Sequence, residues 1–250
     1  MLKLLSYPRS IIIGLFILIW TLFWSFLAVL GSIYCKGVKW GDFIQRNWAC
    51  GLLWPLNIQI EVKGVENLSK ENGIIVFNHA SHFDIPILFR ALRKKTIRFG
   101  AKAELFKIPV FGSAMRGIGA LEIHRGQRER VIKLYERSLK NLAKGYNYVL
   151  APEGTRQASG ELGDFKMGPF IMALAGNCPV FPVVIVGAYN IMPKHSTFPM
   201  WGVWSMKVKV KILPAISTVG MSMDQRQLLR DKVREQMAKA LMNSSGPIEG

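Results

Sequence analysis

Residues 73–84 read GIIVFNHASHFD, a short apolar run followed at once by polar side chains. The run has the length and composition of a buried β-strand, so the polar residues lie where that strand leaves its sheet. From residue 57 onward, similar apolar runs alternate with amphipathic helical patterns. This alternation favours an α/β domain over a helical bundle or an all-β sandwich.

The expected fold is α/β, a mixed β-sheet flanked by helices. Strands are predicted at residues 58–62, 73–77, 96–101, 120–123, 146–151, 180–186 and 206–213. Among the helices we expect one over 127–144 and a last one over 223–242. Ser222 followed by Gln225 forms a capping-box pattern that marks the start of the last helix.

Composition sets limits on size, partners and metal content. A chain of 250 residues that is 50% hydrophobic can bury one sizeable core. The formal charge of +17 arises from 33 Lys and Arg against 16 Asp and Glu, and it favours an anionic partner: nucleic acid, acidic lipid or an acidic carrier. Cys35, Cys50 and Cys178 show no metal-ligand spacing, so we expect reduced thiols and no metal.

The N-terminal segment narrows the choice of partner. Residues 10–35 carry no charge, and this length exceeds the ~20 residues that cross a bilayer. A signal peptide is the alternative, but its apolar core runs only ~7–15 residues. Trp20, Trp24 and Tyr34 suit a retained anchor with interfacial aromatics. We therefore expect a membrane anchor; residues 41–55 then form either an interfacial amphipathic helix or a core helix.

His79 and Asp84 are the sharpest candidates for chemistry. Five residues apart, they would lie about 140° apart on a regular helix, so they meet only if the chain turns between them. The junction between strand and helix supplies such a turn. Asp84 can then accept the Nδ1 proton of His79 and leave Nε2 free to take a proton from a hydroxyl. His82 alone is more often a structural histidine than a catalytic one.

Four motifs in this order resemble the PlsC-type glycerolipid acyltransferase family, which includes the 1-acylglycerol-3-phosphate acyltransferases. The first is Asn78-His79 with Asp84. The others are Lys102 to Gly112 continuing to Arg125, the segment Pro152-Glu153-Gly154-Thr155-Arg156, and the proline-bearing strand Cys178 to Val183. The chain departs from the family's common pattern at Ala80, His82, His124 and Gln157.

The resemblance implies acyl transfer from acyl-CoA or acyl-carrier protein to the 2-hydroxyl of 1-acylglycerol-3-phosphate, giving phosphatidic acid, without a cofactor. His79 is the expected base and Asp84 its partner. The acceptor phosphate is expected at Arg125, Glu153, Gly154, Thr155 and Arg156, and Lys102 is a candidate for oxyanion stabilisation or positioning. Each arginine has a surface ion pair as its alternative role. Glu153 has another alternative, which is to hold its loop by accepting backbone N–H groups.

Three alternative functions stay open at this level. In the first, the chain is an acyltransferase whose acceptor is another lysolipid, such as a lysophospholipid or an ornithine lipid. In the second it is a non-catalytic membrane scaffold, and in the third it is a basic nucleic-acid-binding module. The uncharged segment 10–35 argues against the last, and we expect no nucleic-acid partner. The expected partners are membrane lipids with anionic headgroups, for which Arg90, Arg93, Lys94, Lys95 and Arg98 form a basic cluster.

The expected organisation has three parts. Membrane-anchoring helices occupy residues 1–56, an acyltransferase domain occupies 57–243, and a disordered tail occupies 244–250. The expected location is the inner or cytoplasmic membrane, with the active site on the cytoplasmic side.

Overall fold

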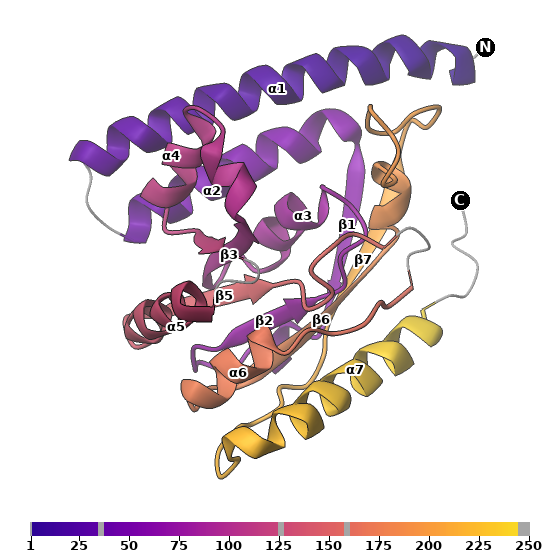
Figure 1. The fold of residues 1–250 in the computed structure, drawn as a ribbon. Coiled ribbons are helices and arrows are strands. Elements are labelled where there is room, and N and C mark those ends of the chain that lie inside the picture. The colour runs from indigo at the N-terminus through magenta and orange to yellow at the C-terminus, as the bar shows by residue number, and fades with distance from the viewer. Residues whose placement is uncertain (1, 35–37, 125–127, 158–160, 245–250) are drawn as a thin grey trace.

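A seven-stranded mixed sheet forms the centre of the protein (Figure 1). The computed structural model describes residues 2–34, 38–124, 128–157 and 161–244. The strand order is β1-β7-β6-β2-β5-β3-β4, and every neighbouring pair is parallel except β6 and β7. The strands are β1 Ile58–Lys63, β2 Ile74–Phe77, β3 Thr96–Lys102, β4 Leu121–Ile123, β5 Tyr146–Leu150, β6 Val180–Val186 and β7 Met206–Ile212.

All seven predicted strands are confirmed, with ends that differ by at most one residue. The helices are α1 Leu2–Tyr34, α2 Val38–Leu53, α3 Asp84–Ala91, α4 Phe111–Gly117, α5 Arg128–Leu142, α6 Gly168–Ala175 and α7 Arg226–Met242. The capping box at Ser222 is present, and it opens a 3-10 turn, Met223–Gln225, that leads into α7. The predicted helix over 127–144 corresponds to α5.

Strand β2 is fully buried because both faces of the sheet are covered by helices (Figure 1). Its odd-numbered side chains, Ile75 and Phe77, face the core that contains α2 and α3. Its even-numbered side chains, Ile74 and Val76, face the core that contains α6 and α7. Side chains alternate between the faces of a strand, so one four-residue strand contributes to both cores.

Helix α1 is long and apolar enough to cross a membrane by length and composition. Buried residues nevertheless occur from its first turns to its end, at Ser6, Ser10, Ile13, Trp24, Ser25 and Ala28. These positions follow the helical period and pack on α2, α4 and the loop after β6. The opposite face of α1 exposes a row of Ile, Leu and Phe side chains. This continuous docking favours a retained helix over a signal peptide.

Helix α2 contributes to the core of the domain. Ala49, Leu52 and Leu53 are buried in the same apolar cluster as the sheet and α3. Of the two alternatives for residues 41–55, the structure therefore places a core helix there. The division of the chain at residue 56 stays a prediction.

The basic cluster of residues 90–98 is only partly a surface cluster, which corrects the expectation. Arg98 is 1% exposed, and its guanidinium pairs with Asp42 of α2. The same side chain donates to the Val38 carbonyl and lies over the Tyr146 ring. The Arg98 side chain points inward from strand β3 and joins that strand to α2. It is therefore not available to bind an anion at the surface.

Candidate active site

The carboxyl ends of the parallel strands β2 and β5 bring the two central motifs together. His79 follows β2 and the segment 152–156 follows β5, and these strands are direct neighbours. Parallel neighbours end at the same edge of a sheet, where ligands of α/β proteins commonly bind. The sequence motifs therefore meet in space although 74 residues separate His79 from Glu153.

The structure brings His79 and Asp84 into contact, while their catalytic role stays a prediction. The Nδ1 atom of His79 lies 2.8 Å from Oδ2 of Asp84. Asp84 is fully buried at the first turn of α3, where the helix dipole favours a carboxylate. The histidine side chain is 21% exposed. With Nδ1 donating to the carboxylate, Nε2 is the basic nitrogen of the ring.

Asp84 also holds the turn that brings it back to His79. Its Oδ2 atom accepts the backbone N–H groups of Ala80 and Ser81, each at 2.8 Å. The hydroxyl of Ser81 accepts the N–H of Phe83 and closes the next step of the turn. One buried oxygen thus fixes both the backbone of residues 80–81 and the imidazole. This arrangement gives Ser81 a structural role, since it caps the turn beside the base.

The segment after β5 makes hydrogen bonds to both the N–H and the carbonyl group of His79. Oε1 of Glu153 accepts the His79 N–H at 3.1 Å, and the Gln157 N–H donates to the His79 carbonyl at 2.8 Å. Oε2 of Glu153 accepts the N–H of Gly163 at 3.3 Å. Burial raises the pKa of Glu153, while these N–H groups act in the opposite direction. Glu153 is 3% exposed, so the geometry favours its alternative role of holding the loop over contact with a phosphate.

Gly154 and Thr155 form the turn that carries Arg156 back toward the base. Gly154 has φ of 69°, a conformation that side-chain-bearing residues rarely adopt, and its N–H donates to the Ala151 carbonyl. Thr155 is exposed. The turn therefore needs glycine at this position to reverse the chain.

Arg156 is the cation that the structure places at the site. Its Nη1 atom is buried and has no hydrogen-bond partner among the described residues. Burial lowers the pKa of Arg156, and the charge of Asp84 acts in the opposite direction. Oδ1 of Asp84 is likewise buried and unpartnered within the described chain. A half-buried guanidinium with a free donor beside His79 and Asp84 is a suitable binding group for an anion.

Two other predicted site residues are not joined to this pair. Lys102 ends β3, which is separated from β2 by β5, and its side chain is exposed. The oxyanion role of Lys102 therefore stays a prediction. Arg125 lies outside the described residues. Its neighbour His124 pairs with Glu122, which also accepts from Arg116.

Sequence reasoning gave no role to several residues that shape the site. Asn78 donates to the Ile185 carbonyl and accepts the Ile185 N–H, which joins the end of β2 to β6. His82 keeps an exposed edge, yet burial of the rest of its ring lowers its pKa to about 4, and the charges of Arg156 and His79 add to this. His82 is therefore neutral at physiological pH and lies beside Arg156. Asn78 stands directly before His79 in the first motif, and this position was the sequence signal that could have indicated its importance.

An apolar cavity of about 130 Å³ lies between α1, α2, α4 and the sheet. Ile85, the residue after Asp84, forms part of its wall together with Phe89 and Phe99. Phe99 contacts Phe77, whose ring meets His79 edge to face at 5.7 Å between centroids. The Phe77 ring thus lies between His79 and Phe99 of the cavity wall.

Comparison with known proteins identifies the family. The sequence profile described as Acyltransferase matches residues 59–186. A 1-acyl-sn-glycerol-3-phosphate acyltransferase of Saccharomyces cerevisiae is 30% identical over 225 residues, which cover 87% of this chain and 72% of the yeast protein. The chain belongs to the acyltransferase family. His79 and Asp84 both lie within the residues that match.

Other relatives agree with this assignment. The chloroplastic 1-acyl-sn-glycerol-3-phosphate acyltransferase LPAT1 of Arabidopsis thaliana is 33% identical over 160 residues, covering 63% of this acyltransferase-family chain and 44% of the plant protein. The match thus spans less than half of that relative's length. The crystal structure of the 1-acyl-sn-glycerophosphate acyltransferase PlsC from Thermotoga maritima superposes with a TM-score of 0.79 at 24% identity and covers 100% of both chains. This likeness confirms the fold.

Proposed function

We propose that this protein transfers a fatty acyl group from a thioester to the 2-hydroxyl of 1-acylglycerol-3-phosphate and thereby forms phosphatidic acid. The observation that carries the proposal is the 2.8 Å contact between His79 and Asp84 beside the half-buried guanidinium of Arg156. A base and an anion-binding group are the two features that this acceptor requires. The yeast and plant relatives are named as 1-acyl-sn-glycerol-3-phosphate acyltransferases, which supports the same assignment.

The reaction needs no covalent acyl-enzyme. Nε2 of His79 takes the proton of the acceptor hydroxyl while that oxygen attacks the thioester carbonyl, and Asp84 stabilises the imidazolium. The carbon–sulfur bond then breaks, and the leaving thiolate takes the proton back from the imidazolium. Oxygen has replaced sulfur on the acyl carbon, and His79 is ready for another cycle. The acyl donor is acyl-CoA or acyl-carrier protein, and the chemistry at the carbonyl is the same for both.

The acyl chain has a suitable place in the apolar cavity that Ile85, the residue after Asp84, borders. Its lining is almost wholly apolar and includes Trp24 and Ala28 of α1 together with Ala114 and Met115 of α4. Each methylene that enters such a compartment contributes about 0.8 kcal/mol. Chain-length preference then depends on the depth of this cavity.

Replacing Ala114 with leucine is expected to shift donor preference toward shorter chains. Ala114 is 4% exposed and lines the cavity, so a larger side chain occupies space that the end of a long chain would use. We expect the ratio of kcat/KM for long over short acyl donors to fall roughly four-fold for each methylene excluded. The measurement is kcat/KM over a series of donor lengths. Ala143→Leu, at an exposed site, is the control, and an unchanged ratio in Ala114→Leu would place the chain elsewhere.

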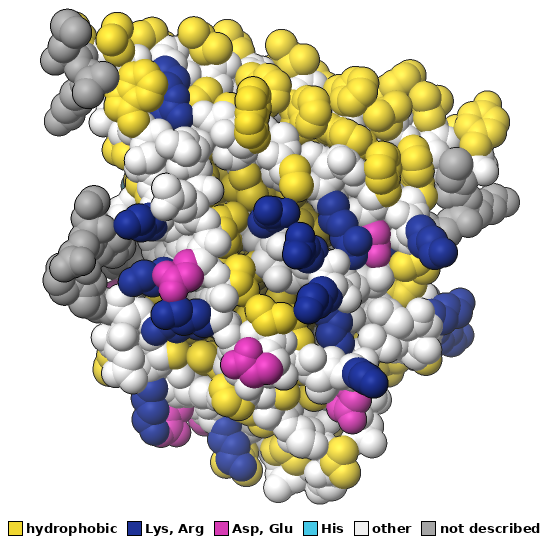
Figure 2. Space-filling view, turned by 180° about the vertical axis from the view of Figure 1, so that it is seen from behind, with side chains coloured by type: hydrophobic (Ala, Val, Ile, Leu, Met, Phe, Trp, Pro, Cys, Tyr) yellow, Lys and Arg dark blue, Asp and Glu magenta, His cyan; other side chains and the backbone are white. Residues whose placement is uncertain are grey.

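The protein acts at a membrane in this proposal, with α1 lying in one leaflet. The helix is docked to the domain along its length, so it cannot stay docked and also cross the bilayer along the membrane normal. Figure 2 shows its apolar side chains as a continuous band along one edge, above a face where Lys and Arg side chains gather. Apolar side chains insert among acyl chains while the cations meet anionic headgroups. We place the active site on the cytoplasmic side of an inner or cytoplasmic membrane.

The acceptor phosphate is tested by replacing Arg156 with alanine. A charge-assisted hydrogen bond contributes about 1.5–3 kcal/mol, so KM for 1-acylglycerol-3-phosphate is expected to rise roughly ten- to hundred-fold. We expect kcat to change much less, because the guanidinium binds the headgroup and not the reacting atoms. Arg234→Ala, which removes an exposed arginine of α7, is the matched control. A KM that is unchanged in Arg156→Ala would contradict phosphate binding by Arg156.

A further inference from the structure

A second cavity lies at the opposite edge of the sheet from the catalytic pair. Its volume is about 460 Å³, and its walls come from the β1–β2 connection, the turn between α3 and β3, and the start of β5. Strands β2, β3 and β5 run parallel and begin here, whereas His79 and Glu153 follow the ends of β2 and β5. This cavity is therefore separate from the catalytic site.

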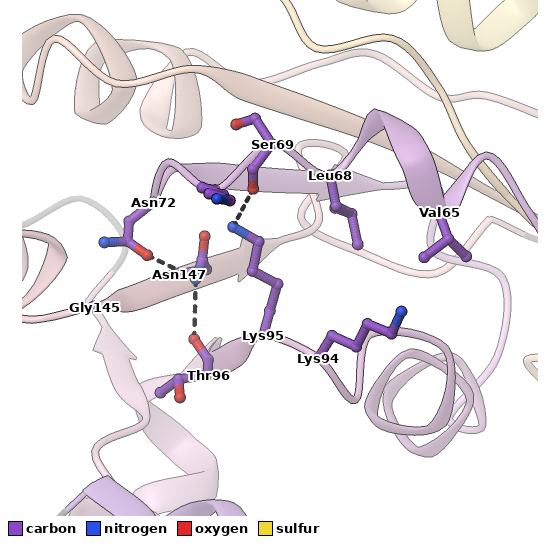
Figure 3. A pocket seen from close by; sticks show the side chains of 10 residues that line it. Val65, Leu68, Ser69, Asn72, Lys94, Lys95, Thr96, Gly145 and Asn147 are labelled. Atoms are coloured by element: carbon purple, nitrogen blue, oxygen red, sulfur yellow. Dashed lines mark hydrogen bonds between the residues drawn. The ribbon is translucent and has the colours of Figure 1, made fainter.

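The floor of this cavity is a fixed network of amide groups. Asn147 is completely buried, and its Oδ1 accepts the Gly73 N–H at 3.0 Å. Its Nδ2 donates to the Thr96 carbonyl and to Oδ1 of Asn72, as Figure 3 shows. The Asn72 amide in turn donates to the Leu142 carbonyl. Four segments of the chain are thus joined here, so the polar groups that face the cavity are held in place before any ligand arrives.

The cavity wall carries lysines and no acid among the described residues. Lys70, Lys94 and Lys95 line it. Figure 3 shows Lys95 extending to the segment that carries Leu68 and Ser69. Its ammonium donates to the Ser69 carbonyl at 2.6 Å and to the Glu71 carbonyl at 2.7 Å. An ammonium has three N–H donors, so one remains beyond these two contacts.

A hydroxyl with no partner completes the donor set. Oγ of Ser69 is buried and makes no hydrogen bond to the part of the chain that the structure describes. A buried polar atom without a partner is costly, and such atoms commonly mark a ligand position. Burial lowers the pKa of Lys95 while the charge of Glu71 opposes the shift, so an anion bound nearby would favour the charged ammonium.

We propose that this cavity binds a phosphate group, carried either by a soluble phosphate ester or by a lipid headgroup. A phosphate monoester carries close to two negative charges at neutral pH. The three lysines supply more positive charge than that, and the nearby Glu71 carboxylate offsets part of the excess. The phosphate oxygens accept from the ammonium groups and from the Ser69 hydroxyl. The volume of about 460 Å³ is large enough to hold more than the phosphate itself. The site is an addition to the catalytic chemistry and does not depend on it.

Binding is tested in the Arg156→Ala background, so that the expected acceptor site does not contribute. The free ester is glycerol 3-phosphate, titrated by calorimetry into purified full-length protein in detergent. The lipid source is a phosphatidylcholine nanodisc with and without phosphatidic acid. The test variant is Lys70→Gln with Lys94→Gln, both exposed lysines whose loss leaves the amide floor intact. The matched control is Lys133→Gln with Lys232→Gln, which removes the same charge from α5 and α7.

The proposal predicts that phosphate binding weakens at least about ten-fold in the test variant and stays within about two-fold in the control. Ser69→Ala is expected to weaken it by about three-fold or more, as loss of one hydrogen bond does. If only the phosphatidic acid nanodisc shows this dependence, the ligand is a headgroup; if glycerol 3-phosphate shows it, the ligand is a soluble ester. Binding of neither source, or equal weakening in test and control variants, overturns the site. The assay measures no acyl transfer, so its result is independent of the proposed activity.

Discussion

The His79→Ala variant is expected to lose roughly 10²- to 10⁴-fold in the rate of acyl transfer, which is the usual contribution of a positioned general base. Among the described residues, no second histidine contacts Asp84, so no other side chain can act as the base in place of His79. KM for the acceptor should change little, because Arg156 remains. The measurement is steady-state kcat and KM with acyl-CoA and 1-acylglycerol-3-phosphate.

His195→Ala is the matched control for this prediction, since it removes an exposed histidine far along the chain. Its kcat is expected to stay within about two-fold of the wild-type value. The two variants should also melt at similar temperatures, because His79 is partly exposed and its backbone contacts survive the change. A His79→Ala protein that is folded and retains most of its activity would show that proton removal occurs elsewhere.

Asp84→Asn is expected to lose roughly 10²- to 10⁴-fold in kcat while leaving the turn largely intact. The amide oxygen can still accept the N–H groups of Ala80 and Ser81, which now bond to the carboxylate. The same oxygen would still face Nδ1 of His79, but a neutral amide stabilises the imidazolium far less than a carboxylate does. The expected loss in kcat therefore comes from the missing negative charge beside the imidazolium.

The Asp84 prediction separates a catalytic role from a merely structural one. Asp84→Ala removes all three contacts of Oδ2, so it should lower stability as well as activity, by about 1–3 kcal/mol for each buried N–H left unpaired. Thermal denaturation and kcat are measured for both variants, with Asp224→Asn at an exposed position as control. Full activity in a stable Asp84→Asn protein would remove Asp84 from the mechanism.

The strands could be predicted from the sequence because their signal is local. Each is a short apolar run bounded by polar or glycine residues, as in Ile74–Phe77 before Asn78 and His79. The meeting of His79 and Asp84 was also predictable, since a strand-to-helix turn is the only geometry that joins residues five apart in that pattern. Both predictions depend only on residues that lie close together in the sequence.

The hydrogen bonds that Glu153 and Gln157 make to the His79 backbone could not be predicted in the same way. Gln157 and Glu153 reach His79 only because β2 and β5 are adjacent in the sheet, and strand order is not encoded in the local sequence pattern. Asn78 bonds to Ile185, 107 residues away, for the same reason. Position in the sheet also separates Lys102 from His79 by an intervening strand.

Burial determines which of the charged residues that the sequence groups together can reach a ligand. Arg98 belongs to the basic run by position, yet its side chain turns inward to Asp42. Glu153 belongs to a motif associated with phosphate binding, yet both of its oxygens accept backbone N–H groups. Composition predicts that a cation or an acid is present but not which way it faces. The arginine that does face the site, Arg156, has a free buried donor in the described structure.

The most direct test of the central claim is to offer the purified protein a labelled acyl-CoA and acyl-carrier protein with a panel of lysolipids, and to identify the labelled product. The account predicts labelled phosphatidic acid from 1-acylglycerol-3-phosphate, formed faster than any product from lysophosphatidylethanolamine or a lyso-ornithine lipid. Labelling of one of those lipids in preference to phosphatidic acid would contradict the proposed acceptor. No labelled product from any acceptor, with a folded protein, would contradict the proposed enzyme itself.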